Sequence, residues 1–154
     1  MKHFSRWAGG LMGLCLLLCT AVSEAADLPI TSPFGWRVHP ITGTWKFHSG
    51  LDLGYDYGSA VPALFNGTVV ETGDFSDGYG NHVTIYHADY DVYTKYCHLA
   101  AIYVEAGQYV IQGQEIGAVG ATGNVTGPHL HLEYIVRNTD TGAYEFADPV
   151  SLWQ

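Results

Sequence analysis

The sequence predicts a small, mainly β domain: an antiparallel, β-sandwich-like sheet with long loops around one face. Short runs rich in Val, Ile, Tyr and Thr recur along the chain, and glycines and polar clusters separate them. Nineteen glycines and eleven tyrosines among 154 residues suit a fold rich in strands and turns. No stretch of the sequence combines a 3.6-residue apolar period with helix caps.

The strands are expected where β-branched and aromatic residues concentrate. In chain order the predicted strands are Gly67–Thr72, His82–His87, Val92–Leu99, Glu115–Val119 and His129–Val136. The polar, Gly-rich stretch Asp74–Asn81 is predicted to be a loop. The loop before Gly50 and the loop Gly120–Pro128 are expected to frame one face of the sheet.

An export signal is expected before this domain. Residues 1–25 have a basic start, an apolar run over Trp7–Val22 and a small-x-small cleavage site at Ser23–Ala25, which are typical of a secretory signal peptide. Residues 26–154 then form the mature domain, secreted across the inner membrane to the periplasm, the cell envelope or the medium. A retained membrane anchor is disfavoured because the run is shorter than the roughly 20 residues that span a bilayer. A lipid anchor at Cys19 stays open, although Leu18 is not the small residue that a lipobox prefers.

The charge of the mature segment excludes two classes of partner. Loss of Lys2, Arg6 and Glu24 leaves four basic and fourteen acidic residues, a net charge of −10. Such a domain is repelled by nucleic acid and by anionic membrane surfaces. We therefore expect no nucleic-acid partner and no stable membrane insertion after signal cleavage.

Two histidine motifs predict a metal site. His129 and His131 are two residues apart in a predicted strand, so their side chains share one face. Upstream, His48 and Asp52 are placed on a loop that enters a strand, because Gly50 opposes a helix. Each motif alone favours a structural interpretation, since two histidines on one strand face can simply form a partly exposed β surface. Together in a short secreted domain they favour zinc, with His48, Asp52 and one of the His129/His131 pair as ligands. The remaining histidine would shuttle protons or stabilise an oxyanion.

Four other side chains carry open alternatives. Strand alternation puts His98 on the face of Thr94 and Tyr96, where it is either a second catalytic imidazole or a surface histidine. Arg37 and its neighbour His39 either line a cleft, with Arg37 gripping a substrate carboxylate, or support their loop. Glu133 either orients an imidazole or caps the end of the strand face.

The remaining strand histidines are given structural roles. His82 and His87 are five residues apart, so a regular strand places them on opposite faces. Both are expected to be structural or exposed.

In order along the chain, these residues resemble the LytM/lysostaphin-type zinc peptidases, the M23 family of peptidoglycan endopeptidases. The resemblance runs from about Ser32 to Pro149. The motifs that carry it are Ser32–Pro40, His48–Asp52, Gly58–Val61, Gly78–Asn81, Tyr96–Leu99, Gly120–Gly123, Thr126–His131 and Asp148–Pro149.

The resemblance implies roles that spacing alone leaves open. It implies one zinc ion per chain held by His48, Asp52 and His131, with His98 and His129 as an unligated catalytic pair. It also implies a fold of the duplicated-hybrid-motif type, a peptidoglycan substrate and cleavage of peptide cross-links by zinc-activated water. The opening motif Phe34–Pro40 is similar to that of relatives that cut D-alanyl cross-links to a diamino acid.

The sequence departs from the family pattern in the turn Ala88–Asp91, which lacks the glycine that many relatives carry there. Many relatives also have an N-terminal inhibitory, coiled-coil or wall-binding region, and the mature segment is expected to have no room for one. We therefore expect activity that is either unregulated in cis or controlled by a regulatory protein partner.

Two other functions compete with this interpretation. Some members of the family have lost their ligands and act only as activators of other wall hydrolases, but here the ligand and catalytic histidine set is complete. The segment Val104–Gly117 is similar to a hairpin of biotinyl or lipoyl carrier domains. That reading fails because Lys95 is the last lysine of the chain, so the hairpin has no attachment residue.

Overall fold

The computed structural model describes residues 28–39 and 42–154. Almost all regular structure in these residues is β, and every strand pair is antiparallel. The elements, in chain order, are β1 (Ile30–Ser32), β2 (Gly35–Val38), β3 (Trp45–His48), β4 (Leu51–Leu53), β5 (Ala60–Pro62), β6 (Gly67–Gly73), β7 (His82–His87), β8 (Val92–Cys97), β9 (Leu99–Ile102), β10 (Tyr109–Val110), β11 (Glu115–Val119), β12 (Leu130–Arg137), β13 (Tyr144–Ala147) and the 3₁₀ helix η2 (Pro149–Trp153).

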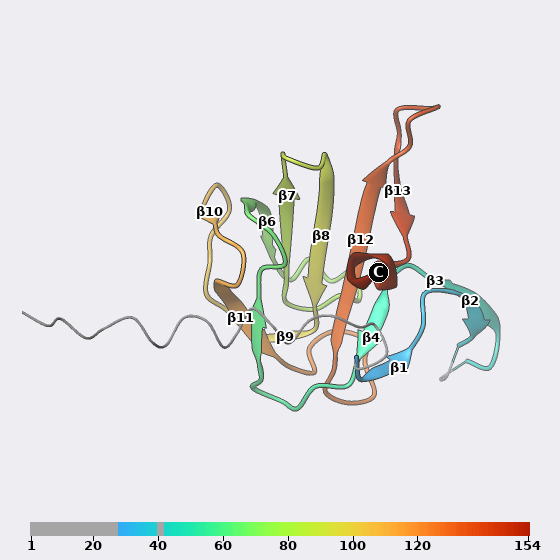
Figure 1. The fold of residues 1–154 in the computed structure, drawn as a ribbon. Coiled ribbons are helices and arrows are strands. Elements are labelled where there is room, and N and C mark those ends of the chain that lie inside the picture. Colours follow the sequence, from blue (N-terminus) through green and yellow to red (C-terminus); the bar gives the residue numbers. More distant parts are fainter. Residues whose placement is uncertain (1–27, 40–41) are drawn as a thin grey trace, which may run out of the picture.

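The strands form three antiparallel sheets (Figure 1). An eight-stranded sheet has the order β1-β4-β12-β8-β7-β6-β10, with β13 pairing with β12. A three-stranded sheet, β5-β11-β9, packs against it, and β2 and β3 form a separate two-stranded hairpin. The hairpin lies beside the β1–β4 end of the large sheet (Figure 1). The predicted antiparallel, sandwich-like class is confirmed.

The hydrophobic core lies between the two larger sheets. Alternation supplies it: on β8, Val92, Thr94 and Tyr96 are buried, while the residues between them are half-buried. The core contains Leu51, Val69, Val83, Ile85, Tyr96, Leu130 and Leu132 from the large sheet and Val61, Leu99, Ile116 and Val119 from the small one. At the N-terminal half of β12, both faces are buried, because Leu130 and Leu132 enter the core while His131 and Glu133 are covered on the other side.

The structure corrects three sequence predictions, and two of these corrections concern the end of a predicted strand. The predicted strand Val92–Leu99 is interrupted at His98, whose φ of 64° is left-handed, so β8 ends at Cys97 and β9 starts at Leu99. Strand alternation therefore does not set the direction of the His98 side chain. The strand with His129 and His131 begins only at Leu130, and His129 forms an isolated bridge with Gly120.

The third correction concerns the upstream motif. His48 and Asp52 lie at the end of β3 and within β4, rather than together on a loop that enters a strand. The loop Asp74–Asn81 is as predicted. The predicted signal peptide at residues 1–25 lies outside the described residues. Within residues 28–39 and 42–154, no helix has the length and apolar character of a membrane span.

Candidate active site

Strand pairing brings the predicted ligands together. His131 on β12 pairs in register with Asp52 on β4, although 79 residues separate them in the sequence. His48 ends β3 and is separated from β4 only by Ser49 and Gly50. Gly50 permits this close approach, because a Cβ atom there would meet Leu132 O at 2.5 Å and the His131 ring at 2.7 Å.

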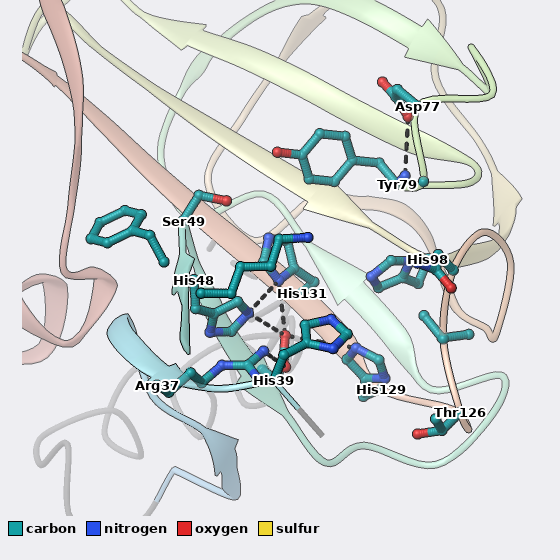
Figure 2. A pocket seen from close by; sticks show the side chains of 16 residues that line it. Arg37, His39, His48, Ser49, Asp77, Tyr79, His98, Thr126, His129 and His131 are labelled. Atoms are coloured by element: carbon teal, nitrogen blue, oxygen red, sulfur yellow. Dashed lines mark hydrogen bonds and ion pairs between the residues drawn. The ribbon is translucent and has the colours of Figure 1, made fainter. Parts of the chain in front are cut away.

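Three donor atoms converge at this point (Figure 2). His48 Nε2 is 3.1 Å from His131 Nδ1 and 3.2 Å from Asp52 Oδ1. His131 Nδ1 is 2.8 Å from the same carboxylate oxygen. Ligands of a tetrahedral zinc ion, at bonds of roughly 2.0–2.1 Å, are spaced about 3.3 Å apart. The three donors thus have nearly the spacing that a single ion needs.

The outer hydrogen bonds of the two imidazoles determine which nitrogen faces the centre. His48 Nδ1 lies 2.7 Å from the carbonyl oxygen of Pro33, so this nitrogen carries the proton and donates. His131 Nε2 lies 3.3 Å from the Glu133 carboxylate and donates in the same way. Nδ1 of His131 and Nε2 of His48 therefore present lone pairs to each other and to an anionic oxygen. In this tautomer the three lone pairs point at one centre, an arrangement that fits a bound cation.

The charges around the centre favour ionised carboxylates. Burial raises the pKa of Asp52, but hydrogen bonds with His131 and His48 outweigh it and hold the pKa well below its usual range. Burial lowers the pKa of His131, but the carboxylates of Asp52 and Glu133 overcome this and raise it. In the absence of metal, a proton held by His131 would compete with a cation for this site.

Two more imidazoles stand beside the centre. The His98 and His129 ring centroids are 4.9 Å apart, and His98 is 5.7 Å from the His131 ring. Nδ1 of His98 donates to the carbonyl of Thr122 at 2.9 Å, and Nδ1 of His129 donates to the carbonyl of Gly127 at 3.0 Å. Nε2 of each ring therefore points away from these carbonyls, and Nε2 of His129 lies 3.6 Å from Asp52 Oδ1. Burial, then the neighbouring His131 and His129, lower the pKa of His98 to about 4, so His98 is neutral near neutral pH.

A buried carboxylate holds the outer side of His131. Glu133 is 1% exposed, and its Oε1 accepts hydrogen bonds from Ser49 Oγ at 2.5 Å and Tyr79 OH at 2.8 Å as well as contacting His131. Of the alternatives for Glu133, the geometry fits an orienting partner of the imidazole. No sequence pattern predicts a role for Ser49 or Tyr79. Both lie in motifs of the family resemblance, but they are 84 and 54 residues from Glu133, so no local pattern pairs them.

The β2–β3 hairpin and two loops wall the centre into an open cleft. Arg37, His39 and Lys46 line it on the hairpin side, and Arg37 Nη2 is 3.8 Å from Asp52 Oδ2. Asp77–Tyr79 and Asn124–Thr126 line the opposite side. Figure 2 shows Arg37 and His39 next to His48, with His98 and Thr126 across the opening. Of the two readings for Arg37 and His39, the cleft-lining one describes their position.

His82 and His87 lie away from this cleft, on opposite faces of β7 as expected. Both are fully buried. His82 contacts Glu71 at 2.9 Å, and His87 contacts the Asn66 carbonyl at 2.9 Å and Thr94 Oγ1 at 2.7 Å. These contacts are those of structural histidines.

Comparison with known proteins places the chain in a family. Peptidase family M23 matches residues 46–142, more than half of the chain. DD-carboxypeptidase/endopeptidase Mpg of Neisseria meningitidis is 47% identical over 104 residues, which are 68% of this chain and 24% of the relative. The chain thus spans about a quarter of the length of this curated relative.

Solved structures agree with this assignment. A zinc-containing peptidase from Vibrio cholerae is similar with a TM-score of 0.69 and 36% identity, over 86% of this chain and 38% of that one. The catalytic domain of the antimicrobial peptidase lysostaphin from Staphylococcus simulans is similar with a TM-score of 0.71 and 30% identity, over 84% of this chain and 94% of that domain. Together with the His/Asp/His centre, these similarities show that the chain belongs to peptidase family M23.

Proposed function

We propose that this chain is a secreted zinc metalloendopeptidase that hydrolyses peptide cross-links in bacterial peptidoglycan. The observation that carries the proposal is the site itself. Three possible zinc ligands converge on one point, and two further imidazoles line the same cleft. A non-hydrolytic activator would need none of these features.

One zinc ion would be held by His48 Nε2, Asp52 Oδ1 and His131 Nδ1. A ligand set of two imidazoles and one carboxylate suits catalytic zinc, which keeps three protein ligands and one open position. When bound, zinc supplies Lewis-acid chemistry, which polarises a carbonyl and makes water nucleophilic near neutral pH. Glu133 fixes the ring of His131 so that Nδ1, not Nε2, is offered to the ion.

The proton transfers of hydrolysis fall to His98 and His129. Each ring donates its Nδ1 proton to a backbone carbonyl, so Nε2 is the atom that can accept a proton from water and return it to the leaving amine. The same nitrogen, once protonated, can stabilise the oxyanion that develops on the scissile carbonyl. The two imidazoles of the acid–base pair, His98 and His129, contact each other in the cleft. No glutamate is therefore required as the general base.

The substrate is proposed to be the D-alanyl cross-link to a diamino acid. The opening motif at Phe34–Pro40 and the 47% identity to an enzyme named DD-carboxypeptidase/endopeptidase support this choice. Stem peptides carry free carboxylates, and Arg37 stands at the cleft wall where it can pair with one. A cell-wall substrate also agrees with export by a signal peptide at residues 1–25 and with a mature domain from residue 26, outside the inner membrane.

The bond assignment is tested with two purified substrates. The mature chain is incubated with D-alanyl-linked muropeptide dimers and, separately, with glycine-bridged peptides. The products are identified by mass spectrometry. We expect monomers from the first substrate alone, at a rate that His129→Ala lowers by roughly 10²–10⁴. Cleavage of the glycine bridge alone would contradict the bond assignment. Cleavage of neither, by protein that holds stoichiometric zinc, would favour the activator role or a required regulatory partner.

A further inference from the structure

The β2–β3 hairpin has two chemically different faces. Pairing places Trp36 opposite Phe47 and Val38 opposite Trp45, so these four side chains share one face. Trp36 and Trp45 are each 70% exposed, Val38 is 55% exposed and Phe47 is 40% exposed. Two indoles this open on one short ribbon form an apolar surface of the kind that marks a binding site. We refer to these four residues as the aromatic face.

The other face of the hairpin belongs to the cleft. Arg37 pairs with Lys46, and Gly35 pairs with His48. The side chains of Arg37, Lys46 and the proposed ligand His48 line the cleft. The aromatic face is continuous with the cleft through Phe47, which lines the cleft and also packs edge-on against Trp36 with ring centroids 5.8 Å apart. A ligand that extends from the cleft past Phe47 would therefore contact the indole of Trp36.

We propose that the aromatic face binds the glycan strand of peptidoglycan while the cross-linking peptide occupies the cleft. The inference rests on the proposed function and extends it from the scissile peptide to the sugar chain that carries the peptide. A pyranose ring presents a flat C–H surface that can stack on an indole, while its hydroxyls stay in water at the rim. Trp rings supply a large, rigid contact area with little conformational entropy to lose.

Charge favours the glycan strand over a membrane surface. Binding to anionic lipid requires basic side chains beside the apolar ones. Arg37 and Lys46 lie on the opposite face of the ribbon, toward the cleft, so the aromatic face has no cation from its own strands. In peptidoglycan the lactyl carboxyl of a muramic acid is amide-linked to its stem peptide, so the sugar backbone there carries no charge for an acidic domain to repel, whereas anionic lipid is repelled.

The test separates binding from hydrolysis. Chelated, inactive protein is co-sedimented with intact sacculi, and its binding to soluble, peptide-free glycan strands, whose muramic acid carboxyls have been amidated to remove their charge, is measured by fluorescence. The test variant is Trp36→Thr/Trp45→Thr, because Thr keeps a high strand propensity. We expect about tenfold weaker binding to both ligands, the loss expected when two aromatic contacts are removed. The matched control is Tyr109→Thr, which removes an aromatic ring that is 62% exposed on β10 at the far edge of the large sheet; its binding should not change.

Turnover gives an independent readout. With zinc present, the ratio of activity on sacculi to activity on glycan-free muropeptide dimers should fall about tenfold in the double variant. The single variant Trp45→Thr guards against damage to the hairpin, because the ring packing between Trp36, Phe47 and Phe34 does not involve Trp45. It should lower the same ratio by a smaller factor.

Three results would overturn the inference. Unchanged binding to sacculi and glycan strands would remove the role of the aromatic face. Equal losses on sacculi and on glycan-free dimers would assign it to the peptide or to the hairpin fold. Unchanged glycan binding together with lost binding to phosphatidylcholine vesicles, or with a lost concentration-dependent dimer, would assign the face to a membrane or to a second copy. If the proposed hydrolysis were wrong, wild-type protein would cleave neither substrate, while the binding measurements would still decide the role of the face.

Discussion

Replacing Glu133 with Gln should weaken zinc binding by about ten- to a hundredfold, the usual effect of losing an outer partner of a ligating histidine. The carboxylate accepts the Nε2 proton of His131 at 3.3 Å, and hydrogen bonds from Ser49 and Tyr79 hold it in place. Burial raises the pKa of Glu133, but the hydrogen bonds from His131 and Ser49 outweigh this and lower it, so the side chain is charged. Gln keeps the shape and one acceptor oxygen but removes that charge. A ten- to a hundredfold change corresponds to about 1.4–2.7 kcal/mol of zinc binding free energy.

The assay is a competitive zinc titration against a chromophoric chelator at fixed pH. Glu71→Gln is the matched control, because Glu71 also pairs with a histidine of the large sheet, His82 at 2.9 Å, but away from the ligands. This control should bind zinc as wild type does. Wild-type affinity in Glu133→Gln would refute the orienting role, and equal weakening in both variants would show that loss of any carboxylate–histidine pair acts through general stability.

Further predictions concern the histidines. His131→Ala should lose both bound zinc and activity, whereas His129→Ala should keep zinc and lose turnover by roughly 10²–10⁴. Zinc analysis together with rate measurements checks both variants. Stoichiometric zinc in His131→Ala would show that the ligand assignment is wrong. Burial lowers the pKa of His87, so the unfolded chain takes up a proton that the folded chain refuses, and stability falls as the pH drops below about 6.5. Urea unfolding of chelated protein at pH 5, 6 and 7 should show that His87→Gln reduces this slope by at most about 1.4 kcal/mol per pH unit; an unchanged slope would mean that His87 accepts its proton while folded.

The strands with the clearest β signal were predictable from sequence. β7 and β11 have the predicted bounds, and β6 and β12 differ by one residue at one or both ends. These segments concentrate β-branched and aromatic residues, so local preference and tertiary pairing agree. The short strands around His48 were missed, because three or four residues between glycines give too few positions for an alternating pattern.

The candidate site could be predicted in composition but not in geometry. The motifs around His48 and His131 contain the proposed ligands, yet only the pairing of β4 with β12 places Asp52 beside His131. The position of His98 depends on a left-handed residue that alternation cannot anticipate. The buried hydrogen bonds to Glu133 join residues that are far apart in the chain, so they leave no local signal.

The central claim is that His48, Asp52 and His131 hold a zinc ion on which cross-link hydrolysis depends. The most direct test is mass spectrometry of muropeptides from purified sacculi treated with the mature chain, with chelator, and with chelator followed by stoichiometric zinc. The account predicts that cross-linked dimers disappear, persist with chelator, and disappear again when zinc is restored. Loss of dimers that continues in chelated protein shown to hold no zinc would contradict it.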